Sequence, residues 1–215
     1  MIKGMLHRKN TKLINKLSAA VFLAAMTAST LSFSKPTKNM SPPKKVVPAA
    51  DLNAEDKLFV ELREAAKVND VAKTRTLGSK LEGHDLSDYV LYFQIKPQIY
   101  DKGAQARVDS SADAAVEAFL KVNAGSAIAD RLRNDWLLVL GKRKDWSNFD
   151  KEYVQFVLND DTQVKCYAIQ SRQAKGEDAK HLGLELKNIL LDAQYFGEAC
   201  PEAAQNIYKI GRAHV

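Results

Sequence analysis

Two pairs of carboxylates come closest to the spacing of an acid–base catalyst. Glu61 and Glu64 lie three residues apart, and Asp160 and Asp161 are adjacent. A glycoside-cleaving pair needs one protonated and one ionised carboxyl group, held in a cleft that separates their pKa values. Both pairs fall on predicted helix faces or at a predicted cap, and every Glu of the chain follows an amphipathic helix pattern or a helix end. We therefore expect these carboxylates to be solvated and predict no catalytic residue.

The histidines do not form a metal-binding pattern. His84 and His181 are far apart and show neither HxxxH nor HExxH spacing, whereas His7 and His214 lie near the two ends of the chain. Zinc and related metals need several such ligands at short, regular spacing. Surface or capping roles are therefore favoured for His84 and His181. No Gly-rich phosphate loop occurs either, so we predict no metal and no cofactor.

The two tryptophans, Trp136 and Trp146, could stack on sugar rings. Both occupy positions where predicted helices pack, so we interpret them as core residues. Trp136 belongs to an apolar set at steps of four, four, three and one, which places its members on one face of a helix between Ser126 and Lys142. The members of this set are Ile128, Leu132, Trp136, Val139 and Leu140.

Four consecutive helices are predicted between Ala112 and Gly176, with very short turns between them. Ser126, Asp145 and Asp161 precede the second, third and fourth helices as N-caps, and Gly176 ends the fourth. The third helix carries an apolar face that includes Phe149, Tyr153, Phe156 and Val157. Chains that turn within a few residues pack each helix against its neighbour, so antiparallel helix pairs follow.

Further helices are predicted on both sides of this segment. Two begin after Asp51, and two more follow Gly176, the last of them with Pro201 in its first turn, where a missing N–H is tolerated. The stretch 88–99 is rich in aromatic and β-branched residues and is compatible with a strand, but its helical surroundings favour a buried helix broken at Pro97. Residues 101–111 are polar and small, which is typical of a loop.

An irregular α-solenoid is the fold class that these elements favour. Phe119 and Tyr153 are 34 residues apart, as are Cys166 and Cys200, and 34 residues is the period of tetratricopeptide-type helix pairs. The characteristic small and aromatic residues do not recur in register. We therefore predict an all-α superhelix of antiparallel helix pairs in which the units differ.

The positive charge of the chain is confined to its first part. Residues 1–50 contain nine Lys or Arg and no acid, so residues 51–215 hold the remaining 23 basic residues against all 26 acids. A folded part with a net charge of −3 does not offer the basic face that nucleic acid requires. We expect no nucleic-acid partner.

The first 50 residues are predicted to be a secretion signal followed by a linker. Residues 1–34 have a positive start and an apolar run, Leu17–Ala28, which is typical of a signal peptide and implies a periplasmic location. Twelve apolar residues are too few for a stable membrane span, which needs about 20. Residues 35–50 hold four of the six prolines and four lysines, so we expect an extended linker. The main domain is then 51–209.

The only two cysteines, Cys166 and Cys200, are predicted to form a disulfide. Disulfides are stable in oxidising compartments such as the periplasm, and the even count leaves no cysteine over. Two buried free thiols are the alternative.

Three segments of the main domain resemble the N-terminal superhelical domain of the soluble lytic murein transglycosylases. RLRNDWLLVLGKRKDWSNF (Arg131–Phe149) is similar to the family's Trp-Leu-x-x-Leu and Asp-Trp-x-x-Phe pattern. KCYAIQSRQAKG (Lys165–Gly176) is similar to its Cys-Tyr-Ala helix, and EACPEA (Glu198–Ala203) to the Ala-Cys-Pro segment one helix pair later. The resemblance extends loosely back to Asp51.

The resemblance implies a curved helical array that forms part of a ring around a separate lysozyme-like domain. The family cleaves peptidoglycan glycan between N-acetylmuramic acid and N-acetylglucosamine to 1,6-anhydro products, with one Glu and no metal. Nothing in this chain matches the catalytic Glu-Ser motif. The expected role is that of the non-catalytic domain, which meets glycan strands through the intact enzyme. A free-standing periplasmic helical-repeat module that binds a protein is the alternative.

The last six residues, Ile210–Val215, are expected to be non-native. IGRAHV is the translation of ATCGGAAGAGCACACGTC, a part of a common sequencing adapter. We therefore expect that the native sequence continues differently after Lys209 and that the chain is truncated before the catalytic domain.

Overall fold

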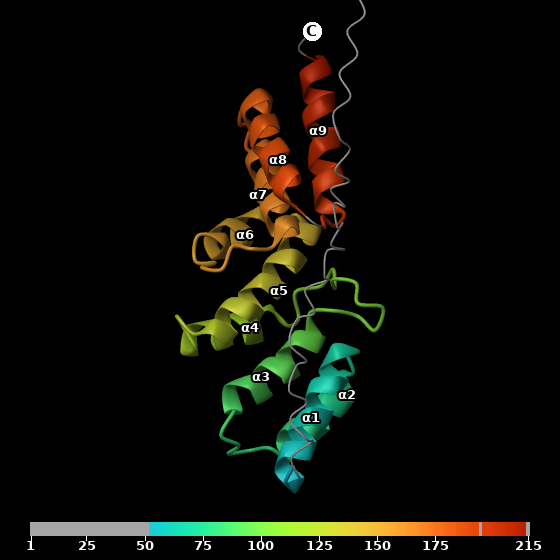
Figure 1. The fold of residues 1–215 in the computed structure, drawn as a ribbon, viewed down its shortest axis with the longest axis vertical. Coiled ribbons are helices and arrows are strands. Elements are labelled where there is room, and N and C mark those ends of the chain that lie inside the picture. The colour runs from blue at the N-terminus through green and yellow to red at the C-terminus, as the bar shows by residue number, and fades with distance from the viewer. Residues whose placement is uncertain (1–51, 194, 214–215) are drawn as a thin grey trace, which may run out of the picture. The chain divides into compact units, whose positions relative to one another are not determined.

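The computed structural model describes residues 52–193 and 195–213, which belong to one compact unit, Pro48–Val215. Within these ranges the chain folds into nine α-helices and one 3-10 helix, with no β-strand (Figure 1). The all-α prediction is therefore confirmed. The predicted signal peptide (1–34), the predicted linker (35–50), Asp51 and the last two residues of the predicted tail lie outside the described residues.

The first three helices are α1 (Ala54–Lys67), α2 (Val71–Ser79) and α3 (Ser87–Ile95), which pack on one another. Asn53 and Asp70 cap α1 and α2, because their side-chain oxygens accept hydrogen bonds from Asp56 N and Lys73 N. The three helices enclose a small core of their own. Its buried members are Leu62, Ala65, Leu77, Leu81 and Val90.

The stretch 88–99 is helical, so the helix interpretation is confirmed and the strand alternative is wrong. It forms most of α3 and the following 3-10 helix η1 (Lys96–Gln98), in which Pro97 lies near the start. Proline cannot donate an N–H to the preceding turn, which accounts for the change from α to 3-10 geometry. The predicted loop at 101–111 contains no helix and is closed by an isolated bridge between Tyr100 and Ala106.

The four helices predicted between Ala112 and Gly176 are present. They are α4 (Asp113–Val122), α5 (Ala127–Arg143), α6 (Trp146–Tyr153) and α7 (Thr162–Ala174). Helix α6 ends earlier than the apolar pattern predicts. Phe156 beyond its end is buried, but Val157 is 84% exposed, so the assignment of Val157 to the apolar face is wrong. A turn after α6 points the two neighbouring side chains in different directions.

The predicted caps of these helices are confirmed. Ser126 Oγ accepts a hydrogen bond from Ala129 N at 3.2 Å, and Asp145 Oδ1 accepts one from Asn148 N at 3.3 Å. Asp161 Oδ1 accepts from Gln163 N at 2.8 Å. Gly176, with φ of 82°, follows the end of α7 in the left-handed region that glycine adopts without strain. Each cap satisfies N–H or C=O groups that a helix end leaves open.

Helices α8 (Ala179–Asp192) and α9 (Ala199–Ala213) pack on each other and on α7. Pro201 lies in the first turn of α9, as predicted. Helix α9 runs beyond Lys209, so its backbone continues into the segment expected to be non-native.

Contacts between helices follow the order of the chain. Helix α3 packs on α4 and α5, α5 packs on α6 and α7, and α7 packs on α8 and α9. The principal contacts join elements that are one or two positions apart in the helix order. Each helix therefore depends mainly on its immediate neighbours.

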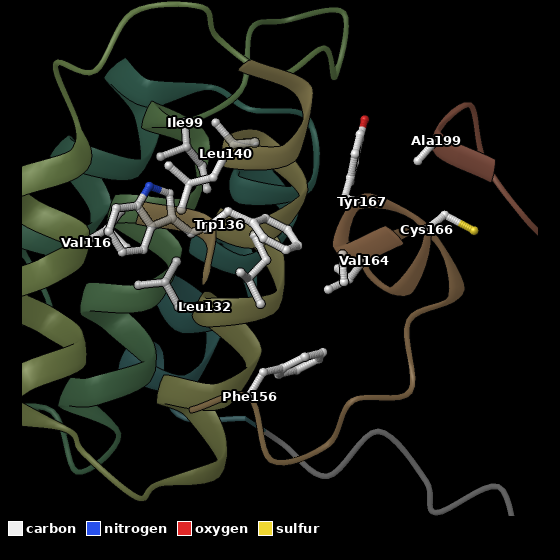
Figure 2. Close-up of a cluster of buried hydrophobic side chains, with 14 of the residues drawn as sticks. Ile99, Val116, Leu132, Trp136, Leu140, Phe156, Val164, Cys166, Tyr167 and Ala199 are labelled. Atoms are coloured by element: carbon white, nitrogen blue, oxygen red, sulfur yellow. The ribbon is translucent and has the colours of Figure 1, made fainter. Parts of the chain in front are cut away.

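The main core surrounds Trp136, whose side chain is 1% exposed. Figure 2 shows its indole among Val116, Leu132 and Leu140, which all belong to the same buried cluster. The indole Nε1 donates a hydrogen bond to Asp113 Oδ1 at 3.3 Å, which satisfies the one polar atom of the ring. Trp136 therefore joins α4 to α5, as its predicted core position implies.

We predict that Trp136→Ala destabilises the chain by about 3 to 5 kcal/mol, because it removes a large buried aromatic side chain and leaves a cavity. Trp146→Ala is the matched control, since Trp146 is only partly buried and should cost less. Chemical denaturation followed by circular dichroism measures both variants. An unchanged midpoint for Trp136→Ala contradicts the prediction.

Candidate functional site

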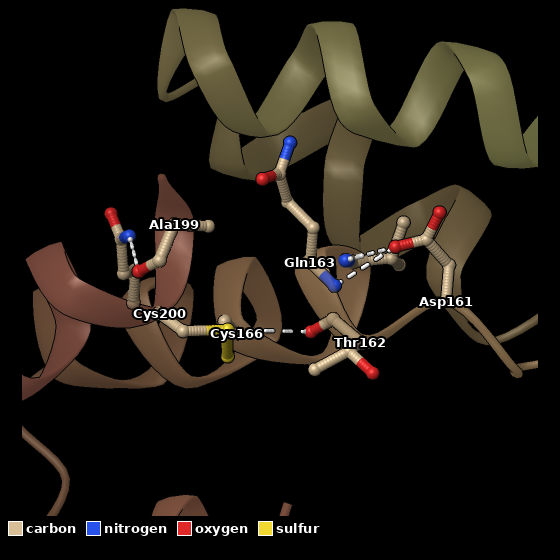
Figure 3. Close-up of a disulfide and its surroundings, with 8 residues drawn as sticks. Asp161, Thr162, Gln163, Cys166, Ala199 and Cys200 are labelled. Atoms are coloured by element: carbon tan, nitrogen blue, oxygen red, sulfur yellow. Dashed lines mark hydrogen bonds between the residues drawn. A yellow bond between two sulfur atoms is a disulfide. The ribbon is translucent and has the colours of Figure 1, made fainter. Parts of the chain in front are cut away.

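The two cysteines lie where α7 meets α9 (Figure 3). The Sγ atoms of Cys166 and Cys200 are 2.05 Å apart, the Cα atoms are 5.0 Å apart, and neither residue is exposed. Gln170 Nε2 donates a hydrogen bond to the carbonyl oxygen of Ala199 at 2.8 Å beside them. These contacts attach the start of α9 to the middle of α7. The pair lies in helix packing and offers no reactive thiol.

Reduction of this pair should destabilise the protein by roughly 3.5 to 4 kcal/mol, because a bridge across about 35 residues restricts the unfolded chain. Intact-mass analysis after alkylation without reductant should add no group to either cysteine. Two added groups would show free thiols. Cys166→Ser/Cys200→Ser provides the same loss of stability without reductant and separates the effect of the bridge from that of the reagent.

The carboxylates with catalytic spacing are not brought together into a cleft. Glu61 and Glu64 are exposed on α1, and Asp160 is exposed beside the α7 cap, Asp161. Glu64 accepts hydrogen bonds from Lys67 Nζ at 2.8 Å and from the adjacent Arg63. The hydrogen bond from Lys67, followed by that from Arg63, lowers the pKa of Glu64. A general acid needs the opposite shift.

The histidines also lie apart. His84 is buried, so the surface role expected for it is wrong: its ring stacks on Phe59 at 5.0 Å and its Nδ1 accepts a hydrogen bond from Leu86 N. His181 is exposed on α8, with Nδ1 3.0 Å from a carboxylate oxygen of Glu177. Among the described residues no group of three His, Cys, Asp or Glu side chains could hold a metal ion.

The tryptophans pack against other side chains. Trp136 is enclosed in the core, and Trp146 packs edge-on against Phe149 with ring centroids 6.0 Å apart. Phe149 in turn lies 5.6 Å from the ring of Tyr153. These three rings of α6 pack against the main core. Trp136 is 1% exposed, so its ring is unavailable for a sugar.

A buried charge network between α5 and α6 is a feature that the sequence reasoning missed. Arg133 Nε lies 3.3 Å from Glu152 Oε2, and Arg133 Nη1 lies 3.3 Å from Asp130 Oδ1. Asp130 also accepts hydrogen bonds from Val157 N and Leu158 N at 3.0 and 2.8 Å. Glu152 is therefore buried, which its amphipathic helix pattern did not indicate.

This network is suited to holding the turn after α6, and not to glycan cleavage. The guanidinium of Arg133 donates a hydrogen bond to Glu152 Oε2, so this carboxylate is paired within the protein. The side chains of both residues are about nine-tenths buried, at 7% exposure each. Spacing alone could have indicated the contact within α5, since Asp130 and Arg133 are three residues apart on a helix.

We predict that Arg133→Met destabilises the chain by about 3 to 5 kcal/mol, because it leaves the buried carboxylates without their cation. Arg133→Met/Glu152→Met should recover part of this loss, since it removes one of those carboxylates. Arg75→Met, at an exposed position of α2, is the control and should change stability little. Equal unfolding midpoints for Arg133→Met and Arg75→Met would show that the network contributes nothing.

Two concave features lie beside α5. One cavity of about 560 Å³ is bounded by α1, α3 and α5, and a second of about 600 Å³ adjoins the loop after η1. Lys67, Lys96 and Asp135 line both of them. Cavities of this size are typical of small-ligand sites. The residues that they share therefore mark the candidate functional site of the chain.

Asp135 is the anchor of this candidate site. Its Oδ2 accepts a hydrogen bond from the Tyr92 hydroxyl at 2.9 Å, and its Oδ1 lies 3.1 Å from Lys96 Nζ. The Tyr100 hydroxyl donates to the carbonyl oxygen of Asp135 at 3.1 Å. Burial, and next the charge of Asp135, raises the pKa of Tyr92 and of Tyr100 far above the usual value. Both hydroxyls therefore stay protonated and act as hydrogen-bond donors.

The arrangement is suited to binding and lacks the parts of a hydrolytic centre. Both carboxylate oxygens of Asp135 are engaged by α3 and η1, at Tyr92 and Lys96. The sequence showed Asp135 only as part of Asn-Asp-Trp, because the contacts come from segments about 40 residues away. Periodicity assigns a face to each helix, but it does not show which buried carboxylate receives a tyrosine from another helix.

No protein-family model, curated protein or solved structure matches this chain. Within residues 52–193 and 195–213, no helix is long and apolar enough to cross a membrane.

Proposed function

We propose that this chain is the non-catalytic N-terminal domain of a periplasmic lytic murein transglycosylase. In this proposal residues 51–209 form a helical array that shapes access to an active site in a separate lysozyme-like domain. The intact enzyme cleaves the glycan backbone of peptidoglycan to 1,6-anhydro products. The partner is the glycan strand, which reaches this domain through the intact enzyme.

One observation carries the proposal: the segments on which the family resemblance depends pack against one another. Phe149 of the Asp-Trp-x-x-Phe segment lies 6.5 Å from the ring of Tyr167 in the Cys-Tyr-Ala segment. Tyr167 also covers Gly141 so closely that a Cβ there would lie 2.3 Å from the ring. Cys166 is joined in turn to Cys200 of the third segment. Motif residues that share one interface support a common packing unit as the origin of the resemblance.

The order of the helix contacts supports a solenoid arrangement of the helices within the all-α fold. Because each helix packs mainly on the next one or two, helix pairs can be stacked in one direction. We propose an irregular superhelix of antiparallel pairs, in which pairs of unequal length replace a strict tetratricopeptide repeat. Such an array can position a polymer or exclude water without supplying an acid.

A second candidate, a free-standing module that binds another protein, is favoured by a groove between α8 and α9. This groove of about 450 Å³ is lined mainly by apolar side chains, among them Leu186, Leu190, Leu191 and Ile207. Apolar surface of this kind is typical of helix-binding grooves. The transglycosylase domain remains the preferred proposal, because the packed motif segments favour it and the groove alone does not specify a partner.

The native gene tests the proposal directly. The reading frame should continue after Lys209 into a lysozyme-like domain with a catalytic Glu. Deletion of residues 51–209 from that protein should reduce release of 1,6-anhydro-muropeptides from sacculi while the isolated catalytic domain retains cleavage of short glycans. A frame that stops without such a domain contradicts the proposal and leaves the protein-binding module.

We predict that the chain purified as given does not cleave peptidoglycan. Cleavage requires a carboxylic acid held near the glycosidic oxygen with a raised pKa, and the buried Glu152 is instead paired with Arg133. Digestion of purified sacculi followed by analysis of soluble products is the measurement. Release of 1,6-anhydro-muropeptides that is lost in Glu152→Gln but kept in Glu61→Gln would overturn the prediction.

A further inference from the structure

The cavity between α1, α3 and α5 concentrates positive charge in a mildly acidic part of the chain. Residues 51–215 have 23 basic and 26 acidic residues, yet this cavity is lined by four cations and one carboxylate. The cations are Arg63, Lys67, Lys96 and Arg131, and the carboxylate is Asp135. The excess of positive charge lies at a concave surface, so the packing of the helices does not account for it.

The four cations differ in how far they are already neutralised. Lys96 lies 3.1 Å from Asp135, and Arg63 and Lys67 share Glu64 at the rim. Arg131 is exposed and forms no ion pair with any residue that the structure describes. Its guanidinium lies close enough to Tyr92 to influence that hydroxyl. Arg131 is therefore the group in this cavity that is best placed to receive an external anion.

The remaining walls are aromatic and aliphatic. Tyr89 and Phe93 of α3 and Ile128 at the start of α5 line the same cavity. Tyr89 is 41% exposed, so its ring is accessible from solvent. A guanidinium beside aromatic and methyl-bearing surface suits a ligand that combines a carboxylate with small apolar groups. A phosphate or a nucleic-acid backbone would use the charge alone and leave the aromatic and aliphatic walls without a partner.

We propose that this cavity binds a peptide with a free carboxylate, which pairs with Arg131 while small apolar side chains lie against Tyr89 and Phe93. The planar guanidinium offers two parallel N–H donors that match the two oxygens of a carboxylate. Lys67, which is paired with Glu64, also lines the cavity. A volume of about 560 Å³ admits a short peptide segment.

The source of the peptide follows from the proposed function, on which this step rests. The peptide stems of peptidoglycan carry free carboxylates and alanine methyl groups, so they have the chemistry that the cavity presents. The cavity would then hold stems of a glycan strand while the strand is cleaved elsewhere in the intact enzyme. An acidic peptide from another protein shares the carboxylate but not the D-amino acids and the γ-linkage of the stem.

Isothermal titration of the purified chain tests the proposal with defined peptides. The probes are the stem tetrapeptide L-Ala-γ-D-Glu-meso-diaminopimelate-D-Ala, the same peptide with its carboxylates amidated, and L-Ala-L-Glu-L-Ala-L-Ala. We expect the first to bind and the amidated form to bind at least about tenfold more weakly, as the loss of a charged hydrogen-bonded pair implies. Arg131→Gln should weaken binding of the stem peptide by a similar factor.

Arg75→Gln is the matched control, because Arg75 is an exposed helical arginine of α2 that lines neither cavity. It should bind the stem peptide like the parent chain. If the L-peptide binds as tightly as the stem peptide and Arg131→Gln abolishes both, the cavity is a carboxylate site. Peptidoglycan is then not the source of its ligand. Absence of saturation by either acidic peptide at millimolar concentration, or equal effects of the two arginine variants, overturns the site itself. Neither result depends on the presence of a catalytic domain.

Discussion

The structure depends on the burial of α5 along most of its length and on more than one face. Helices α3, α4, α6 and α7 all pack on it, so charged residues as well as apolar ones become enclosed. A charge taken out of water is tolerated only with partners. Asp130, Arg133 and Asp135 therefore obtain theirs from other segments, which ties α6 and α3 to the central helix. The polar network is a consequence of how many neighbours α5 has.

The same constraint links the core to the candidate site. Asp135 follows the buried side of α5, one residue before Trp136, and its oxygens face Tyr92 and Lys96. Where α1 and α3 do not close fully over this part of α5, a cavity remains with Asp135 at its wall and Arg131 one turn earlier. The concave surface is thus formed by charged residues of a central helix that its neighbours cover incompletely.

Local rules predicted the helices well because each signal lies within one segment. Ser126, Asp145 and Asp161 cap the helices that their positions indicate, and Pro97 changes α3 into a 3-10 turn. Contacts between segments were not predictable in this way. Glu152 is buried against Arg133 of α5, and Val157 is exposed beyond the end of α6. Periodicity reveals neither.

The candidate site required the same long-range information. In the sequence, Arg131 is only a basic residue near a predicted helix start. Its aromatic neighbours in the cavity come from α3, which the sequence does not place beside it.

When helices contact mainly their neighbours, the position of each pair depends on its interface with the next pair. A weakly packed interface would then let the two sides of a binding surface move apart. Three kinds of contact oppose this here: Trp136 between α4 and α5, Arg133 between α5 and α6, and the cysteine pair between α7 and α9. They lie at three different joints between helices and use different physical interactions. A domain that positions a polymer for chemistry done elsewhere needs such stiffness more than it needs a reactive group, because a misplacement of about 1 Å can cost a reaction about a hundredfold in rate. On this argument the buried polar and covalent links of the chain are its functional elements in the proposed enzyme, although none of them would touch the reacting bond.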